Sequence, residues 1–356
     1  MSAPPCIVST ATAVPAHAAT QDEVKARLAE VFDLPERRRD AAFELFDNAA
    51  VGCRYSVEPI AALGRERSLG EIQERYREHA IALGRDVAAR AIAGAGITAA
   101  DVDLVISVSC TGIMIPSLDA HLANELGFRP DVRRLPLTEL GCVGGAAALA
   151  RAHDFLVGFP EARVLVVAVE LPSLSMQRAD LSVGNLVSTA LFGDGAAAAV
   201  LTGGRASNGH PTVRILETIS HLFPQSTGAL GFDLQDDGFH SVLSKDVPYL
   251  LKTEIARLVR VLADRRGLSR EHLSCFVLHP GGRKILDVVE DELGLTREDT
   301  QLSWDVLRGY GNQSSASVLF VLHEWLTKRR PAPGAHGVLA AFGPGLSTEM
   351  LLLEWS

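Results

Sequence analysis

The sequence of 356 residues predicts an α/β protein in which two similar halves pack into five layers, α-β-α-β-α. One observation is a repeated order of elements: helix, acidic bend, short buried strand, polar loop, helix. Another is spacing, because Cys110 and Cys142 stand 32 positions apart while His279 and Asn312 stand 33 apart. If the central strands of the two halves pair, the loop-to-helix junctions of both halves should meet in the middle of the molecule.

The first half begins with an apolar strand at Ile7, which Pro15 ends. Residues 21–90 are predicted to be mostly helical and carry many i,i+4 charge pairs, so they should cover the core rather than form it. The repeated pattern follows as a helix at 81–95, a buried strand at 104–109, a helix at 116–126, the glycine turn 141–145 and a helix at 146–157. This alternation suits a sheet buried between helices.

The middle of the chain is predicted to hold a strand at 164–169 and a second strand that ends in Phe192-Gly193-Asp194-Gly195. Glycines, Asn208 and Pro211 then mark a loop at 203–211. We expect the halves to divide there, into residues 1–209 with the reactive cysteine and residues 210–356 with its histidine and asparagine partners.

The second half repeats the order of the first. Its predicted elements are a helix at 250–266, a strand at 275–278, the loop His279-Pro280-Gly281-Gly282, a helix at 284–293, the loop 309–312, a helix at 313–326 and a strand at 338–342. The two halves therefore share one plan.

Composition excludes several classes of protein. No stretch approaches eighteen uninterrupted apolar residues and no signal peptide is recognisable, so a cytoplasmic location is expected. Five widely spaced cysteines without CxxC pairs argue against a disulfide framework and against a zinc site. A net charge of −9 argues against a general nucleic-acid binder. A small anionic ligand would need only a local basic cluster.

Cys142 is the candidate nucleophile. A helix that begins at or just after it would aim free backbone N–H groups at the thiol and lower its pKa. Gly141, Gly144 and Gly145 would leave room for a substrate carbonyl and for close packing of neighbouring backbone. On these residues alone, a small buried core cysteine is an equal alternative.

A thiol nucleophile needs a base, and acyl transfer through a thioester needs donors for the oxyanion or enolate that develops. His279 directly follows a buried strand, and Asn312 opens a helix between small residues. Each has an ordinary alternative, a core histidine and a helix N-cap. Their matched positions in the duplicated plan favour the catalytic interpretation.

Several motifs together resemble the type III polyketide synthases, the chalcone synthase superfamily. They are Gly141-Cys142, His279-Pro280-Gly281-Gly282, Gly309-Tyr310-Gly311-Asn312 with Gln313-Ser314-Ser315, and Ala341-Phe342-Gly343-Pro344-Gly345. The resemblance covers nearly the entire chain and implies a thiolase-like fold. Ala341 departs from the glycine that the family usually has, which could crowd the cyclisation pocket.

By this resemblance, Cys142 takes an acyl chain from coenzyme A and forms a thiolate–imidazolium pair with His279. His279 and Asn312 would hold the enolate formed when malonyl-CoA loses carbon dioxide. No metal or cofactor is implied beyond the coenzyme A thioester substrates. The resemblance also implies Phe192 and Phe239 as aromatic gatekeepers and assigns coenzyme A binding to Arg54 and Lys284. A homodimer is expected.

The cavity departs from the plant pattern. The implied lining consists of Cys110, Thr111, Ile115, Ser175, Leu230, Ser314, Gly343 and Pro344. The cysteine at position 110 resembles bacterial members of the family, including the tetrahydroxynaphthalene synthases. Ile115 holds the position whose side chain, in the family, crosses the dimer interface. A small, apolar lining favours long-chain acyl starters and alkylpyrone or alkylresorcinol products.

Alternatives remain open at the level of sequence. A tetrahydroxynaphthalene-type synthase would use malonyl-CoA only, and a beta-ketoacyl-acyl carrier protein synthase III would deliver its product to a carrier protein. A cysteine hydrolase would use the same three residue types but lacks a papain-like signature here. A non-catalytic binding protein is disfavoured because the reactive residues and both glycine loops are intact. Lactone, aldol and Claisen ring closures are not distinguished.

Overall fold

The computed structural model describes residues 3–32, 36–204, 213–236 and 238–356. Nine strands form its largest sheet, in the order β11-β12-β13-β8-β1-β7-β6-β4-β5. The first-half strands are β1 (Cys6–Ala13), β4 (Leu104–Val108), β5 (Arg133–Leu137), β6 (Arg163–Glu170) and β7 (Gly195–Thr202). The second-half strands are β8 (Val213–Leu222), β11 (Leu273–Leu278), β12 (His336–Gly343) and β13 (Ser347–Trp355).

The two halves of this sheet pair by the same rule. From β1, the first half continues through antiparallel β7, antiparallel β6 and then parallel β4. From β8, the second half continues through antiparallel β13, antiparallel β12 and then parallel β11. The halves join where β1 pairs with β8 at Cys6 and Ile7 only. The predicted duplication is therefore present in the strand order.

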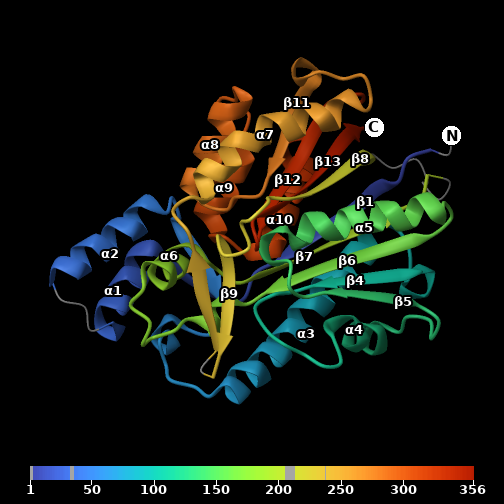
Figure 1. The fold of residues 1–356 in the computed structure, drawn as a ribbon. Helices are drawn as coiled ribbons and strands as arrows, with labels where there is room; N and C mark the ends of the chain where they lie inside the picture. Colours follow the sequence, from blue (N-terminus) through green and yellow to red (C-terminus); the bar gives the residue numbers. More distant parts are fainter. Residues whose placement is uncertain (1–2, 33–35, 205–212, 237) are drawn as a thin grey trace.

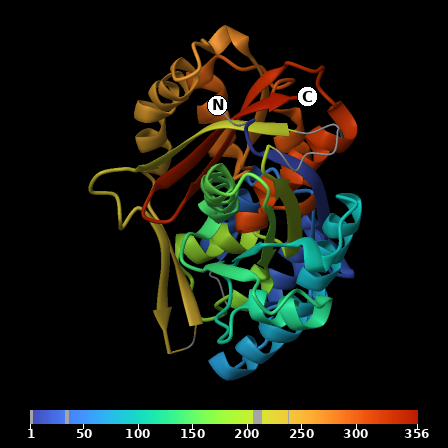
Figure 2. The same cartoon turned by 90° about the vertical axis from the view of Figure 1, so that its right-hand side faces the viewer.

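The helices complete five layers (Figure 1). The outer face of the first half is covered by α3 (Leu69–Gly94) and α4 (Leu118–Leu126), and that of the second by α7 (Val247–Asp264) and α8 (Arg283–Leu293). Between the half-sheets lie α5 (Gly144–Gly158) and α10 (Ser317–Glu324); α5 is the green helix seen end-on in Figure 2. One hydrophobic cluster joins both halves across this central layer. The predicted thiolase-like α-β-α-β-α arrangement is confirmed.

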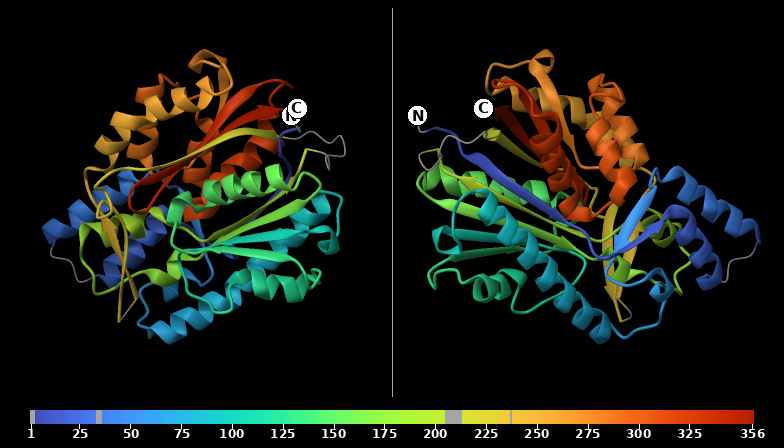
Figure 3. Two further views of the ribbon diagram at one scale, coloured as in Figure 1. Left: turned by 45° about the vertical axis from the view of Figure 1, so that its right-hand side comes forward. Right: turned by 180° about the vertical axis from the view of Figure 1, so that it is seen from behind.

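Three insertions leave this duplicated frame. The first, residues 14–68, holds β2 (His17–Thr20), α1 (Gln21–Val31), α2 (Glu36–Asn48), β3 (Cys53–Ser56) and the short helix η1 (Ile60–Ala62). The second, residues 171–194, holds η4 (Pro172–Ser175) and α6 (Val183–Leu191). The third, residues 223–246, holds the hairpin β9 (Leu230–Gln235) and β10 (Gly238–Leu243). Figure 3 shows that all three gather at the end of the molecule opposite the termini.

The remaining elements are short, apart from α9 (Gln301–Tyr310). They are η2 (Ala99–Asp101), η3 (Gly141–Val143), η5 (Arg270–His272), η6 (Ser314–Ala316) and the π-helical turn η7 (Trp325–Arg329). Within the described ranges, no helix combines the length and apolarity that crossing a membrane requires.

Some predicted elements need correction. The helix predicted to begin at residue 81 begins at Leu69, because Ser68 and Glu71 form a capping box there. The strand predicted to end at Phe192 is wrong: residues 183–191 form α6, whose first turn is capped by the Ser182 side chain. The predicted dividing loop lies mostly at 205–212, outside the described residues, so the boundary between the halves stays a prediction.

Candidate active site

Cys142 lies in η3, immediately before α5 begins. Gly141 has a φ of 55°, in the left-handed region, and a Cβ there would lie 2.5 Å from Pro344. The late glycine loop of the second half thus closes directly over the turn that carries the thiol.

The start of α5 packs against η6 of the second half with no room for a side chain. A Cβ on Gly145 would lie 2.1 Å from the Ser315 carbonyl oxygen, and one on Gly144 would lie 2.6 Å from the Val108 side chain. The predicted role of these glycines in close backbone packing is confirmed. Their space is filled by protein, so it holds no substrate carbonyl.

Asn312 is fixed from both sides by backbone hydrogen bonds. Its N–H donates to the Leu191 carbonyl at 2.9 Å, and the Gly193 N–H donates to the Asn312 carbonyl at 3.0 Å. Its side-chain Oδ1 accepts from the Ser314 N–H at 2.8 Å and from the Ser317 hydroxyl at 3.3 Å. Because Oδ1 already accepts two hydrogen bonds, the amide is oriented with its NH₂ group available as a donor on the cavity side.

His279 follows β11 and is 1% exposed. Its backbone N–H donates to the Ala340 carbonyl at 2.8 Å, which holds the residue at the strand end. Neither imidazole nitrogen has a hydrogen-bond partner among the described residues. A buried ring with both nitrogens unpaired is available to exchange a proton with whatever enters the cavity.

Cys142, His279 and Asn312 line one cavity, which we call the catalytic cavity; it encloses about 1630 Å³ including its open mouth. The structure thus brings together the three residues that spacing predicted, two from one half and one from the other. Leu230 and Pro344, both predicted to line a substrate site, also line this cavity.

Burial controls the electrostatics of the reactive pair. It raises the pKa of Cys142 to about 11, although hydrogen bonds with Ser314 and Asn312 act in the opposite direction. It lowers the pKa of His279 to about 3. The predicted lowering of the thiol pKa is therefore wrong, because burial raises it more than the hydrogen bonds lower it. Taken separately, the Cys142 thiol and the His279 imidazole are therefore both uncharged near neutral pH.

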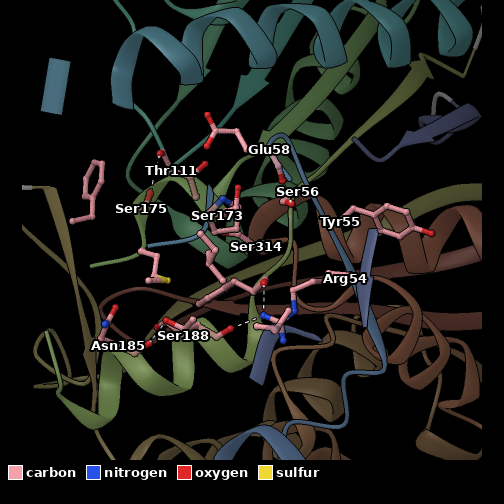
Figure 4. Close-up of a pocket in the computed structure, with 18 of the residues that line it drawn as sticks. Arg54, Tyr55, Ser56, Glu58, Thr111, Ser173, Ser175, Asn185, Ser188 and Ser314 are labelled. Carbon is pink, nitrogen blue, oxygen red and sulfur yellow. Dashed lines mark hydrogen bonds between the residues drawn. The ribbon is translucent and has the colours of Figure 1, made fainter. Parts of the chain in front are cut away.

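A second pocket, here called the inner pocket, adjoins the first and encloses about 1010 Å³. Figure 4 shows it, with Thr111, Ser175 and Ser314 among its lining residues. Cys110 and both predicted gatekeepers also line it, and Phe192 lines the catalytic cavity as well. Phe192 therefore stands at the boundary between the two spaces.

The inner pocket is less uniformly apolar than predicted. Hydroxyl groups line much of it, from Ser56, Thr111, Ser173, Ser175, Ser188, Thr189, Ser241 and Ser314. Many of them already donate to protein acceptors; the Thr111 hydroxyl, for example, donates to Glu170 at 2.8 Å. Each hydroxyl oxygen can still accept, so the lining suits a ligand that carries both carbon and oxygen.

Glu170 was not singled out from the sequence. It ends β6, is fully buried, and accepts from the Cys110 N–H at 3.1 Å and from the Ser315 hydroxyl. Burial raises its pKa and, with the nearby carboxylate, the pKa of Cys110. The Ser314 hydroxyl contacts both thiols, at 3.3 Å for Cys110 and 3.6 Å for Cys142. An acid directly after a run of buried strand residues was the available signal.

Arg54 is held by acceptors of the protein itself. Its guanidinium is buried and donates to the carbonyl oxygens of Thr189, Ala190 and Phe192 and to the Gln21 side chain. Three of these acceptors are backbone groups at the end of α6, which lack partners within the helix. These contacts give Arg54 a structural role, and its side chain also lines the inner pocket. Its coenzyme A contact stays a prediction.

Lys284 lies at the mouth of the catalytic cavity with Lys245 and Arg283. Arg283 pairs with Asp287 at 3.6 Å, whereas Lys245 and Lys284 have no ion pair within the part of the chain described. Three cations at one opening suit phosphate groups. The coenzyme A contact of Lys284 stays a prediction.

Two other predicted residues lie outside the cavities. A Cβ on Gly343 would meet the Leu140 carbonyl at 2.7 Å, so this glycine serves backbone packing and the predicted lining role is wrong. Ile115 is 93% exposed on the protein surface. No group of three or more His, Cys, Asp or Glu side chains suited to a metal ion occurs in the ranges that the structure describes.

Comparison with known proteins covers both halves of the chain. The N-terminal domain of the chalcone and stilbene synthases matches residues 50–205, and their C-terminal domain matches residues 214–355. A 1,3,6,8-tetrahydroxynaphthalene synthase of Streptomyces peucetius subsp. caesius is 39% identical over 98% of this chain and 93% of its own length. The alpha-pyrone synthesis polyketide synthase-like Pks18 of Mycobacterium tuberculosis is 30% identical over 99% and 92%, respectively.

A solved structure gives the same result. The 1,3,6,8-tetrahydroxynaphthalene synthase of Streptomyces coelicolor A3(2), a bacterial type III polyketide synthase, superimposes with a TM-score of 0.93 at 36% identity, over 99% of each chain.

Proposed function

This chain belongs to the chalcone and stilbene synthase family and is a type III polyketide synthase, an acyltransferase that works by decarboxylative Claisen condensation; on that premise we propose how its residues divide the work and which starter it takes. The observation that carries the proposal is the shared cavity of Cys142, His279 and Asn312. It offers a nucleophile, a base and an amide donor within one enclosed space.

In the loading step, the Cys142 thiol passes its proton to His279 and the sulfur attacks the carbonyl of an acyl-CoA. The coenzyme A sulfur then leaves and takes a proton from the imidazolium, so the site returns to its neutral state. Burial of both groups supports this order, because neither carries an isolated charge at rest.

In the extension step, malonyl-CoA loses carbon dioxide and the electron pair moves to the enolate oxygen. The imidazole N–H of His279 and the Asn312 NH₂ group are the donors proposed to hold that oxygen. The enolate carbon attacks the acyl-Cys142 thioester, the C–S bond breaks, and the thiol is restored with a proton from solvent. These steps use the protein groups and the thioesters alone, and we propose no cofactor.

We propose an aliphatic acyl-CoA starter, with alkylpyrone or alkylresorcinol products. Support comes from the part of the inner pocket that the first insertion lines, where Val24, Ile60 and Leu63 face the space together with Met176. Each buried methylene contributes about 0.8 kcal/mol, so such a wall favours a hydrocarbon tail. The hydroxyls nearer Cys110 would face the polyketide oxygens.

A second candidate uses malonyl-CoA alone and makes a tetrahydroxynaphthalene-type product. The hydroxyl-rich lining favours it, and so does the 39% identity to a protein named for that product. Transfer to an acyl carrier protein is the less supported alternative.

We also propose a homodimer in the cytoplasm. Ile113 and Ile115 are large apolar side chains that stand exposed just before α4, as a buried subunit contact would require. Cys53, Cys110, Cys142 and Cys275 form no disulfide, which suits a reducing compartment.

Product analysis tests the proposal. Purified protein is incubated with malonyl-CoA and saturated acyl-CoA starters of two to eighteen carbons, and products are identified by mass spectrometry. Alkylpyrones or alkylresorcinols are expected from the longer starters, and Cys142→Ala should make none. Cys275→Ala, which removes a buried thiol that lines neither cavity, is the matched control. Elongated product from Cys142→Ala would show that Cys142 is not the nucleophile. A naphthalene product formed without any acyl-CoA starter would establish the second candidate, the synthase that uses malonyl-CoA alone.

A further inference from the structure

We propose that the first insertion, together with Met176 of the second, sets the longest aliphatic chain that this enzyme accepts, and that Leu63 and Met176 end the acyl site. This inference rests on the proposed acyl-CoA starter and names the part of the pocket wall that would limit the length of its acyl chain. The frame would position the reacting thioester, and residues 14–68 would form the far end of the inner pocket.

The inner pocket has two kinds of wall. One comes from the frame and the short segments beside it, where Cys110, Thr111 and Ser314 lie next to the catalytic centre. The other comes from the first insertion. Its apolar side chains, Ala19, Val24, Ile60, Ala62 and Leu63, form what we call the carbon wall, and Arg54, Ser56 and Glu58 of the same insertion also line the pocket. An alkyl tail would contact the carbon wall.

Behind the carbon wall lies a separate hydrophobic cluster. It is built from the first insertion and α6, and its buried members are Ala19, Val24, Leu28, Phe32, Ala42, Phe46, Leu186 and Ala190. Ile60, Leu63 and Met176 pack on its edge while lining the pocket. An alkyl tail that reached them would extend an existing cluster, which needs no new cavity in the main core.

The end of the pocket is held in place. Arg27 of α1 donates through Nε to the Leu63 carbonyl at 3.2 Å and through a terminal nitrogen to the Ala61 carbonyl at 3.0 Å. Gly64 has a φ of 77°, and a Cβ there would lie 3.2 Å from the Met176 Cε and 2.3 Å from Val31. The turn after η1 is thus tied to α1 and touches Met176, so it forms a defined stop.

Chain length is the quantity to measure. Each methylene that loses its contact should lower affinity about fourfold, so removing space for two methylenes should cost about tenfold or more. We expect Leu63→Trp to lower kcat/KM at least about tenfold for starters of twelve to sixteen carbons, with those of four to six carbons within about twofold. Leu63→Ala and Met176→Ala should move the preferred starter to longer chains.

Leu28→Ala is the matched control, because Leu28 belongs to the same cluster but does not line the pocket. It should lower the melting temperature without changing the order of starter preference. Circular dichroism and gel filtration establish that each variant is folded before its profile is measured.

The two levels of the proposal fail separately. If the wild-type enzyme uses no starter longer than six carbons, the proposed acyl starter is wrong and this inference falls with it. If long starters are used but folded Leu63→Trp, Leu63→Ala and Met176→Ala keep the wild-type profile, only the role of the first insertion is wrong. A change in profile produced equally by Leu28→Ala would also overturn it.

Discussion

The two halves of this molecule present different chemistry from the same backbone positions. In the first half, Cys110 follows β4 and Cys142 precedes α5. In the second half, His279 follows β11 and Asn312 precedes η6 and α10. One half thus places thiols at both junctions, and the other places a base and an amide donor. A nucleophile and its partners meet because equivalent junctions face each other across the central helices.

The halves also differ between their last two strands. The second half turns from β12 to β13 through residues 344–346, whereas the first half leaves β6 at residue 171 and returns to β7 only at residue 195. That excursion carries α6 and Phe192, which line both cavities. The comparison teaches that the catalytic groups come from what the halves share, whereas the insertions, which they do not share, supply much of the substrate wall.

The largest effect should come from replacing the base of the second half. His279→Gln should lower kcat by about 10²- to 10⁴-fold, because the thiol loses its proton acceptor. The wild-type pair has pKa values of about 3 for His279 and about 11 for Cys142, so its total proton count is constant between them. Alkylation of Cys142 by iodoacetamide should therefore be nearly independent of pH from 5 to 9.

In His279→Gln the thiol must ionise alone, so the alkylation rate should rise about tenfold per pH unit over the same range. Mass spectrometry of the Cys142 peptide separates this reaction from that of the other cysteines. A steep pH dependence already present in the wild type would mean that the two junctions do not act as a pair.

The contact between the two junctions can be tested by one methyl group. Gly145→Ala would place a Cβ 2.1 Å from the Ser315 carbonyl oxygen, and the helix must move to relieve the clash. We expect a loss of about 3 kcal/mol in the free energy of unfolding, measured by urea denaturation, together with reduced activity. Gly158→Ala, in the same helix with no atom within 4 Å, should be neutral or slightly stabilising.

A smaller effect separates structure from substrate binding at Arg54. Arg54→Met would remove the guanidinium donor of the Thr189 and Phe192 carbonyls and should destabilise the protein by about 2 kcal/mol. The KM for acyl-CoA should stay within about twofold of wild type in the folded fraction. An unchanged melting temperature with a much higher KM would restore the coenzyme A role that the sequence suggested.

The smallest effect is expected at the cavity mouth. Lys284→Gln should raise the KM for malonyl-CoA about threefold at low salt, because one exposed cation contributes little to phosphate binding. The difference should shrink as sodium chloride is added. Lys252→Gln, which breaks an ion pair with Glu292 on the same outer layer, should leave KM unchanged. An equal effect of the two substitutions would remove Lys284 from the substrate path.

The catalytic residues could be predicted from the sequence because the spacing of residues within each half reveals the duplication. The distances Cys110 to Cys142 and His279 to Asn312 are local properties of each half, and equivalent positions in a duplicated fold meet by symmetry. The insertions do not repeat between the halves, so no second copy within the chain could guide their prediction. Residues 183–191 are rich in apolar and β-branched side chains, and only the Ser182 cap and packing against α2 and β10 make them helical.

Burial was the other quantity that the sequence did not contain. The family resemblance implied coenzyme A binding by Arg54, but it gave no sign that the carbonyl oxygens at the end of α6 hold the guanidinium inside the protein. The Cys142 pKa was predicted to fall because a helix start can be recognised in a sequence, whereas the enclosure that raises it comes from both halves together. A local sequence pattern predicts where a residue lies in the fold more readily than it predicts how buried that residue is.

The separation between frame and insertions has a consequence for how this enzyme could diversify. Each insertion leaves and re-enters the frame beside a strand or helix end, and the three gather at one end of the molecule. Changes of length or sequence there leave the strand register and the facing junctions intact. New substrate ranges can therefore arise, or be engineered, by exchanging residues 14–68, 171–194 or 223–246, with one unchanged set of reacting groups.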